Sequence, residues 1–144
     1  MVYNIFLDAN VFLDVFLQRT DEWKIAEQLL RLGADYKVKL YTSPNNLINV
    51  MYALKRQKLT QKQIIEFIEL ALTYTKLSET SGASFSQGLN AGFTDLEDAV
   101  QYYTALTIPG IDYFITSNYK DYKKAVNSLP VLTPKQFIAL FNKK

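Results

Sequence analysis

Acidic and amide side chains gather at three points of the sequence, each next to the expected end of a strand or start of a helix. In an open α/β sheet, ligands bind at the carboxyl ends of the strands, at the switch point of the strand order. If the first and fourth strands are neighbours, the first and third of these groups meet at that point. The three groups are Asp8 with Asn10; Asp95 with Glu97 and Asp98; and Thr116, Ser117 and Asn118 with Asp121.

Carboxylates brought together at such an edge favour the binding of a hard metal ion. Two or three of them within about 4 to 6 Å repel, and at least one pKa rises unless a cation neutralises the group. The chain has no His and no Cys, which excludes His-based triads, thiol nucleophiles and the usual zinc sites. Oxygen ligands alone suit Mg²⁺ or Mn²⁺. Such a site can activate water and stabilise an in-line attack on a phosphodiester.

The acids of the first and third groups also have structural explanations. Asp8 or Asn10 can simply cap the helix that follows, which contributes about 1 kcal/mol. Asp14, further along that helix, is interpreted as a solvent-facing or locally bonded side chain. Asp121 is interpreted as a surface acid of a short helix rather than a ligand. On this stretch alone, the structural and the functional interpretations of Asp8 are equally open.

The acids of the second group differ in how well a structural role explains them. Thr94 and Glu97 have the spacing of a capping box, which would account for Glu97. Asp95 can serve the helix dipole from the first turn. Asp98 has neither role, so after Asp8 it is the acid that we most expect in a functional site.

Length and composition define the class of protein. A chain of 144 residues is expected to form one domain that buries a proper core. Its net charge of +2 permits a nucleic-acid partner without requiring one. We find no leader segment at the start and no apolar run of the length that spans a membrane. These features predict a cytoplasmic protein with no membrane partner.

Strands and helices are expected to alternate along the chain, which predicts an α/β fold with a parallel sheet covered on both faces. The predicted strands are the apolar run before Asp8 and residues 38–41, 74–77, 112–116 and 129–132. The predicted helices are residues 11–18, 21–32, 44–57, 61–73, 78–92, 95–107 and 119–126, and a C-terminal helix that ends with Lys144.

Local signals mark where several of these helices begin and end. Ser43 followed by Pro44 is typical of an N-cap and a first helical position, and capping boxes begin at Thr60 and Thr133. Gly33 predicts the end of the second helix. In the helix at 44–57, the residues expected to face the core are Leu47, Ile48, Val50, Met51 and Leu54.

The order and spacing of five sequence segments are informative when taken together. These segments are Phe6 to Val11, Thr42 to Val50, Phe93 to Ala99, Asp112 to Tyr122 and Leu129 to Pro134. Together they resemble a PIN domain, the fold of the ribonuclease toxins in VapBC-type toxin–antitoxin pairs. The resemblance covers nearly the whole chain and implies a single PIN-like domain over residues 1–144. It implies a parallel five-stranded sheet of order 3-2-1-4-5 with helices on both faces. It also implies an endoribonuclease that depends on Mg²⁺ or Mn²⁺.

Positions in this resemblance correspond to four metal-site residues of the family. Asp8 and Asp98 match the first and third acids, and Asn118 falls at the fourth, where the family has Asp or Asn. The second position departs from the pattern, because the family usually has Glu there and this chain has Asn49. Asn49 offers a neutral oxygen but no charge, so weaker metal binding is expected unless another acid compensates. The acids that could compensate are Asp95, Glu97 and Asp121.

The first functional hypothesis is a metal-dependent ribonuclease, the toxin of a toxin–antitoxin pair. Its partners would be RNA, an antitoxin protein and, by family analogy, a second copy of the chain. The catalytic residues in this hypothesis are Asp8, Asp98, Asn118 and Asn49. The metal ligands are drawn from Asp8, Asp98, Asp95 and Asn118. The supporting residues are Asn10, Thr116 and Asp121.

Two other hypotheses come from different classes of protein. A catalytically weak or inactive PIN-like module that binds RNA or a protein partner is favoured by Asn49. A nucleotide-binding Rossmann-like domain is disfavoured, because no Gly-rich phosphate loop follows the first strand.

Overall fold

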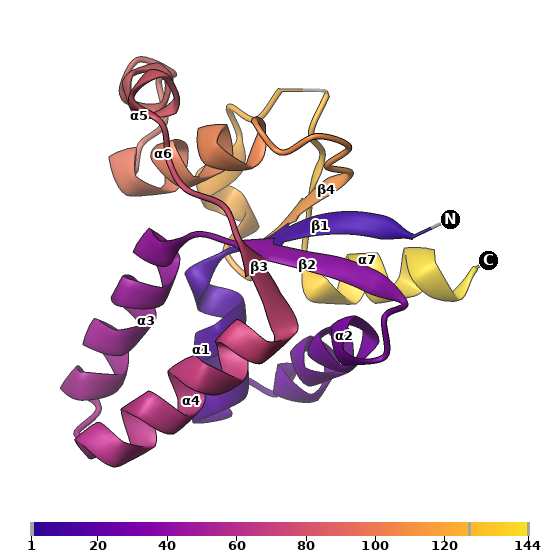
Figure 1. The fold of residues 1–144 in the computed structure, drawn as a ribbon. Coiled ribbons are helices and arrows are strands. Elements are labelled where there is room, and N and C mark those ends of the chain that lie inside the picture. The colour runs from indigo at the N-terminus through magenta and orange to yellow at the C-terminus, as the bar shows by residue number, and fades with distance from the viewer. Residues whose placement is uncertain (1, 127, 144) are drawn as a thin grey trace.

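The computed structural model describes residues 2–126 and 128–143, which form a parallel sheet with helices on both faces (Figure 1). The strand order is β3-β2-β1-β4-β5, and every pairing is parallel. The predicted order 3-2-1-4-5 is therefore confirmed. The strands are β1 (Tyr3–Leu7), β2 (Val38–Thr42), β3 (Thr75–Leu77), β4 (Tyr113–Ile115) and β5 (Val131–Leu132). Lys144, at the end of the expected C-terminal helix, lies outside the described residues.

Helices α5 and α6 lie on one side of the sheet, and α1, α2 and α7 lie on the other (Figure 1). The stretch of small residues at 78–92 does contain a helix, and the helix expected at 119–126 is a single 3-10 turn, η1. No helix in the described part of the chain combines the length and the apolar character needed to cross a membrane. The helical bounds are α1 (Ala9–Leu17), α2 (Trp23–Ala34), α3 (Pro44–Arg56), α4 (Gln61–Tyr74), α5 (Gly82–Leu89), α6 (Leu96–Ala105), η1 (Tyr119–Tyr122) and α7 (Pro134–Asn142).

Strand β1 is buried on both faces, as expected for an inner strand of a parallel sheet. Its side chains alternate between two cores. Ile5 and Leu7 pack among residues of α1, α2, α3 and α7, whereas Phe6 packs on the side of α6. There Phe6 stacks on Phe114 of β4 with ring centroids 5.3 Å apart, and Tyr102 of α6 packs against Phe114. All five side chains are fully buried, so the packing holds the carboxyl end of β1 in place.

Three helix starts predicted from local sequence, those of α3, α4 and α7, are confirmed. Ser43 caps α3 through its side chain, and Pro44 is the first helical residue. Thr60 and Thr133 each head a complete capping box, in which the Gln three residues later bonds back to the cap. These caps satisfy backbone N–H groups that a helix leaves unpaired at its start.

The predicted end of α2 at Gly33 is wrong, and packing explains why. The helix continues to Ala34. Gly33 lies inside the helix, where only a glycine fits because the side chain of Leu40 from β2 occupies the space that a Cβ at residue 33 would need. The glycine therefore serves the close approach of helix and strand rather than the end of the helix.

The predicted buried face of α3 is partly wrong. Leu47, Val50 and Leu54 are buried as expected, but Ile48 and Met51 are 45% and 42% exposed. The three buried residues recur at positions i, i+3 and i+7, which form a narrow stripe on one side of a helix. Ile48 and Met51 lie beside that stripe and line an open groove of about 520 Å³ together with residues of α4.

The strand register brings the first and third polar groups together. Leu7 of β1 pairs with Ile115 of β4, and the Asp8 backbone N–H donates to the Ile115 carbonyl at 3.0 Å. Asp8 and Thr116 therefore follow paired residues at the same edge of the sheet. This is the switch point at which ligands bind in open α/β sheets.

Candidate active site

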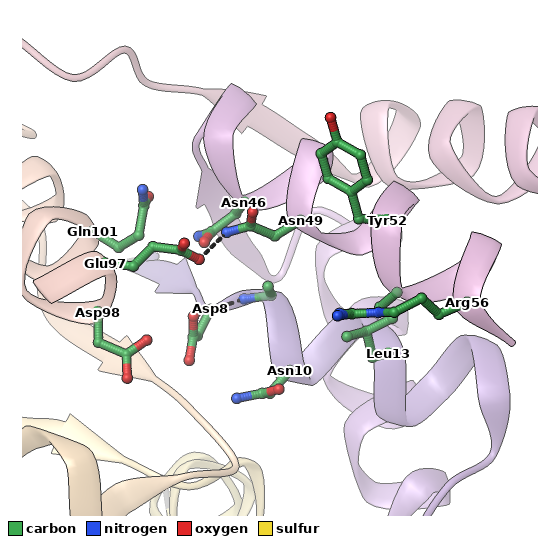
Figure 2. Close-up of a pocket in the computed structure, with 12 residues that line it drawn as sticks. Asp8, Asn10, Leu13, Asn46, Asn49, Tyr52, Arg56, Glu97, Asp98 and Gln101 are labelled. Carbon is green, nitrogen blue, oxygen red and sulfur yellow. Dashed lines mark hydrogen bonds between the residues drawn. The ribbon is translucent and has the colours of Figure 1, made fainter. Parts of the chain in front are cut away.

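An open cleft of about 390 Å³ lies at the carboxyl end of β1, between the starts of α1 and α6 and one face of α3 (Figure 2). Four of the residues predicted for the site line it, namely Asp8, Asn10, Asn49 and Asp98. Glu97 lies beside Asp98 on α6; Asp98 projects toward Asp8, and Glu97 projects toward Asn49 (Figure 2). The cleft therefore has an acidic wall on α6 and an amide on the facing wall of α3.

Asp8 both caps a helix and belongs to the cleft. It is 3% exposed, and its Oδ1 accepts a hydrogen bond from the Ala9 backbone N–H at 2.8 Å. Its Oδ2 accepts hydrogen bonds from the hydroxyls of Thr116 at 2.9 Å and Tyr122 at 3.3 Å. Burial raises the pKa of Asp8 above its ordinary value, although these hydrogen bonds act in the opposite direction. The two interpretations of Asp8 are therefore compatible.

Asp98 lies in the first turn of α6 and faces Asp8 (Figure 2). The pKa of Asp98 is raised to about 8, most by burial and then by the charges of Asp8 and Asp95 and the contact with Asp121. A carboxyl group in this setting holds its proton until a cation or a higher pH displaces it. Acids from all three groups of the sequence thus interact at one place.

The start of α6 differs from the predicted capping box. The helix begins one residue later than expected, and its N-cap is Asp95, whose Oδ1 accepts a hydrogen bond from the Asp98 backbone N–H at 2.9 Å. The predicted pairing of Thr94 with Glu97 is therefore wrong, because Asp caps a helix at least as well as Thr. Glu97 instead accepts a hydrogen bond from Asn49 Nδ2 across the cleft.

Thr116 and Asn118, which follow β4, are hydrogen-bonded to two of the acids. Thr116 donates to Asp8, as its expected orienting role requires, and its oxygen accepts the Asn118 backbone N–H at 3.0 Å. Asn118 Nδ2 donates to Asp121, whose half-buried carboxylate contacts Asp98. Asp121 is therefore more than a surface acid. Asn118 is exposed and lies outside the described lining of the cleft.

A second network lies behind the cleft and joins α1 to the loop after β4. Asp14 is 5% exposed and accepts hydrogen bonds from Arg19 Nε at 3.0 Å and from the Ser117 hydroxyl. Arg19 Nη2 also donates to Asn10 Oδ1 at 3.4 Å, so the contact of Asn10 is with Arg19 rather than with an acid. Of the two interpretations of Asp14, the solvent-facing one is wrong, because its side chain is buried, and the locally bonded one agrees with its ion pair to Arg19 five residues later.

Two buried residues at this site were missed from the sequence. Tyr122 is 3% exposed and bonds to Asp8, and its pKa is raised by burial and by the charges of Asp8 and Asp98. Gln101 is 1% exposed and lines the cleft, where its Oε1 accepts a hydrogen bond from Ser43. Its Nε2 has no partner among the described residues. An isolated Tyr or Gln carries no local pattern, so only the packed structure identifies them.

The oxygen donors of the cleft fit a hard divalent cation. They are carboxylates and neutral amides, and the raised pKa values of Asp8 and Asp98 reflect burial and repulsion that a bound cation would relieve. Within residues 2–126 and 128–143, no group of three or more acidic side chains is arranged so that it could hold a metal ion. Asp8 and Asp98 are the residues that would hold the cation, with amide oxygens beside them.

Replacing Tyr122 by Phe should weaken Mn²⁺ binding about tenfold, as the loss of a hydrogen bond to a metal-ligating side chain typically does. The ring stays in place, but Asp8 loses a donor that orients it and lowers its pKa. Calorimetric titration with Mn²⁺ at constant pH measures the change. Unchanged affinity would show that the Tyr122 hydroxyl does not position Asp8.

Tyr102→Phe is the matched control for this substitution. Tyr102 is also buried, but its hydroxyl donates to the backbone carbonyl of Leu129 at 2.6 Å rather than to an acid. Its loss should lower the free energy of unfolding by about 1 kcal/mol and leave the Mn²⁺ affinity unchanged. The comparison separates a general effect on stability from an effect on the site.

Comparison with known proteins identifies the family. The model of the PIN domain matches residues 4–120, and the chain therefore belongs to the PIN domain family. Ribonuclease VapC1 of Aquifex aeolicus (strain VF5) is 27% identical over 143 residues, which cover 96% of this chain and 95% of that protein. PIN-domain ribonucleases of this kind generally depend on a divalent metal ion.

Two solved structures share the fold. VapBC2 from Rickettsia felis, bound to a DNA fragment from its promoter, matches with a TM-score of 0.66 at 14% identity over 90% of this chain and 98% of that chain. VapC20 of Mycobacterium tuberculosis, a toxin that cleaves the sarcin–ricin loop, matches with a TM-score of 0.59 at 15% identity over 76% of this chain and 86% of its own. At these identities, the two structures support the fold alone.

Proposed function

We propose that this chain is a metal-dependent endoribonuclease that hydrolyses RNA phosphodiester bonds and acts as the toxin of a toxin–antitoxin pair. The observation that carries the proposal is the pair of interacting acids, Asp8 and Asp98, at the switch point of a PIN-domain sheet. Two similar proteins support the proposal: VapC1 is named a ribonuclease, and VapC20 is described as a toxin that cleaves the sarcin–ricin loop. The proposed cofactor is Mg²⁺ or Mn²⁺, which oxygen ligands prefer.

In the proposed reaction Asp8 and Asp98 hold the cation. When bound, the ion supplies Lewis acidity and neutralises charge at the phosphate. The hydroxyls of Thr116 and Tyr122 orient Asp8 through their hydrogen bonds. Asp121 adds negative charge beside Asp98. The chain thus contributes two metal-binding carboxylates and a surrounding set that holds them in position.

The remaining predicted residues have auxiliary roles in this proposal. Asn49 lines the cleft and can offer a neutral oxygen to the ion or to its water. Asn118 is proposed to act in the same way from the loop after β4. Asp95 contributes negative charge from the N-cap of α6, where its Oδ1 accepts a hydrogen bond from the Asp98 backbone N–H. Asn10 lines the cleft, and a hydrogen bond from Arg19 holds its side chain in position.

Cleavage of structured RNA with and without metal tests the proposed activity. The purified protein is incubated with cellular tRNA and ribosomal RNA in EDTA, and again after Mg²⁺ or Mn²⁺ is supplied. We expect discrete cuts with metal and none in EDTA. Cleavage that persists in EDTA would overturn metal dependence, and RNA that stays intact with both metals would overturn the ribonuclease function.

A weak or inactive PIN module is the second candidate, and Asn49 favours it. A neutral residue in the cleft leaves less negative charge to attract a cation. This alternative predicts that the protein binds RNA without turnover and that Asp8→Asn leaves the binding unchanged. The proposed ribonuclease predicts turnover that Asp8→Asn abolishes, so one pair of assays separates the two candidates.

The groove between α3 and α4 is the surface that we propose for an antitoxin. It is lined by the apolar side chains of Ile48, Met51, Leu59, Ile64 and Ile65. An amphipathic helix buries its apolar face in a groove of this kind. The name of VapBC2, a relative in fold, supports a partner of this class. A second copy of the chain is proposed as a partner by family analogy.

Arg56 and Tyr52 are proposed to bind the RNA strand at the mouth of the cleft. They lie one turn apart on α3, both exposed, and line the cleft opposite the acidic wall (Figure 2). A guanidinium pairs with phosphate, and an exposed ring stacks on an unpaired base. Arg56→Ala and Tyr52→Ala should each raise the KM for cleavage about tenfold with little change in kcat.

Steady-state kinetics on one cleaved RNA measure both constants. Arg31→Ala and Tyr36→Ala are suitable controls, because both residues are exposed in or just after α2 and lie outside the described lining of the cleft. They should leave the KM unchanged. A fall in kcat with no change in the KM would contradict a role for Arg56 and Tyr52 in binding the strand.

A further inference from the structure

Glu97 projects into the cleft from the first turn of α6 but does not cap that helix, because Asp95 does. The hydrogen bond that the structure gives it crosses the cleft to Asn49 on α3, 48 residues earlier in the chain. Figure 2 shows Glu97 extending from α6 toward Asn49 and Asp98 extending from the same helix toward Asp8, and all three acids line the same cleft. Glu97 is therefore placed to act on the same space as Asp8 and Asp98.

The charge of Glu97 is not balanced by its neighbour. Asn49 is neutral, and none of the ion pairs among the described residues includes Glu97. One turn later on α6, Gln101 is 1% exposed and lines the same cleft, and its Nε2 has no partner within the described part of the chain. An unpaired buried amide costs about 1–3 kcal/mol. This wall thus carries an exposed carboxylate without an ion-pair partner among the described residues, which suits a cation, and a buried N–H donor, which suits an acceptor such as water or a phosphate oxygen.

The other acids near Asp98 are engaged differently. Asp95 Oδ1 holds the Asp98 backbone N–H, and Asp121 accepts a hydrogen bond from Asn118 on the far side of the site. In the part of the chain that the structure describes, neither is hydrogen-bonded to α3. Glu97 is the acid whose partner is Asn49 itself, so its charge lies nearest to the neutral position in the cleft.

We propose that Glu97 supplies from α6 the carboxylate charge that Asn49 does not supply from α3, and thereby sets the affinity of the cleft for a divalent cation. The inference rests on the proposed metal-dependent function. It follows from electrostatics, because the attraction between a carboxylate and a cation depends on their distance and not on which helix carries the charge.

Mn²⁺ titration calorimetry on an exchange series tests the inference. Glu97→Gln keeps an oxygen that can accept the hydrogen bond of Asn49 but removes the charge, and should weaken Mn²⁺ binding about tenfold. The double variant Asn49→Glu/Glu97→Gln moves the charge to α3 and should recover most of that loss. Asn49→Glu alone should bind at least as tightly as the wild type. Glu66→Gln, an exposed change on α4, is the control and should match the wild type.

The outcomes distinguish a failure of the inference from a failure of the proposed function. If Glu97→Gln binds Mn²⁺ like the wild type while Asp98→Asn does not bind, the inference is overturned and the metal site stands. If the double variant is as weak as Glu97→Gln, charge exchange between the two walls is overturned. If the wild type binds no Mn²⁺, the metal-dependent function fails and the inference fails with it.

Discussion

Replacing Asp98 by Asn should lower RNA cleavage by about a thousandfold or more, and Asp8→Asn should do the same. Each change keeps the shape of the side chain and removes a charge that holds the cation. The charges of the two acids interact across the cleft. Removing one member of a catalytic unit often costs nearly as much activity as removing the whole unit. Single-turnover cleavage of an end-labelled RNA measures the loss.

The control for these variants is Asp35→Asn, because Asp35 is an exposed acid at the end of α2 and should keep full activity. Thermal unfolding tests whether the variants fold, and the direction of the change in Tm can be predicted for Asp98→Asn. The pKa of Asp98 is raised from 3.8 to about 8, so its ionisation lowers the stability of the metal-free protein as the pH rises through that range. Asp98→Asn should therefore keep or raise the Tm near pH 8. Full cleavage by Asp98→Asn would remove this residue from the mechanism.

The affinity for Mn²⁺ should rise about tenfold per pH unit from about pH 6 to pH 8 and then level off. A metal binds the deprotonated carboxylate, and Asp98 holds its proton up to a pKa of about 8. Each bound ion therefore releases a proton below that pH. The raised pKa of Asp8 acts in the same direction and steepens the dependence. Calorimetry in buffers of different ionisation enthalpy measures both the affinity and the protons released.

Asp98→Asn should bind Mn²⁺ weakly and lose most of this pH dependence. Asp112→Asn is a matched control, because Asp112 accepts a hydrogen bond from the Asn4 backbone at the opposite end of the sheet and should leave the slope unchanged. A wild-type affinity that stays constant over this pH range would show that Asp98 is not a ligand.

Signals that act over a few residues were readable from the sequence. The caps at Ser43, Thr60 and Thr133 depend on side chains within three positions of the helix start. The strand before Asp8 is a short apolar run, so Asp8 was expected at the carboxyl end of a strand. The sheet order came from the resemblance to PIN domains, and the strand pairings confirm it.

Contacts between distant segments were not readable in this way. Asn49 and Glu97 meet across 48 residues, and Ser117 reaches Asp14 across 103. From the sequence, a capping box with Thr94 accounted for Glu97, whereas in the structure Asp95 is the N-cap. Tyr122 became part of the site only because η1 lies against the end of β1.

The sequence by itself determined the class of fold and placed two acids, Asp8 and Asp98, at the candidate site, because local sequence patterns mark strand ends and helix starts. The tertiary structure decided which side chains surround them, including Glu97, Tyr122 and the exposed face of α3. The physical reason is that pairwise distances, burial and the resulting pKa values depend on how α6 and η1 pack on the sheet. That packing is the sum of many weak contacts, and no short stretch of sequence specifies it.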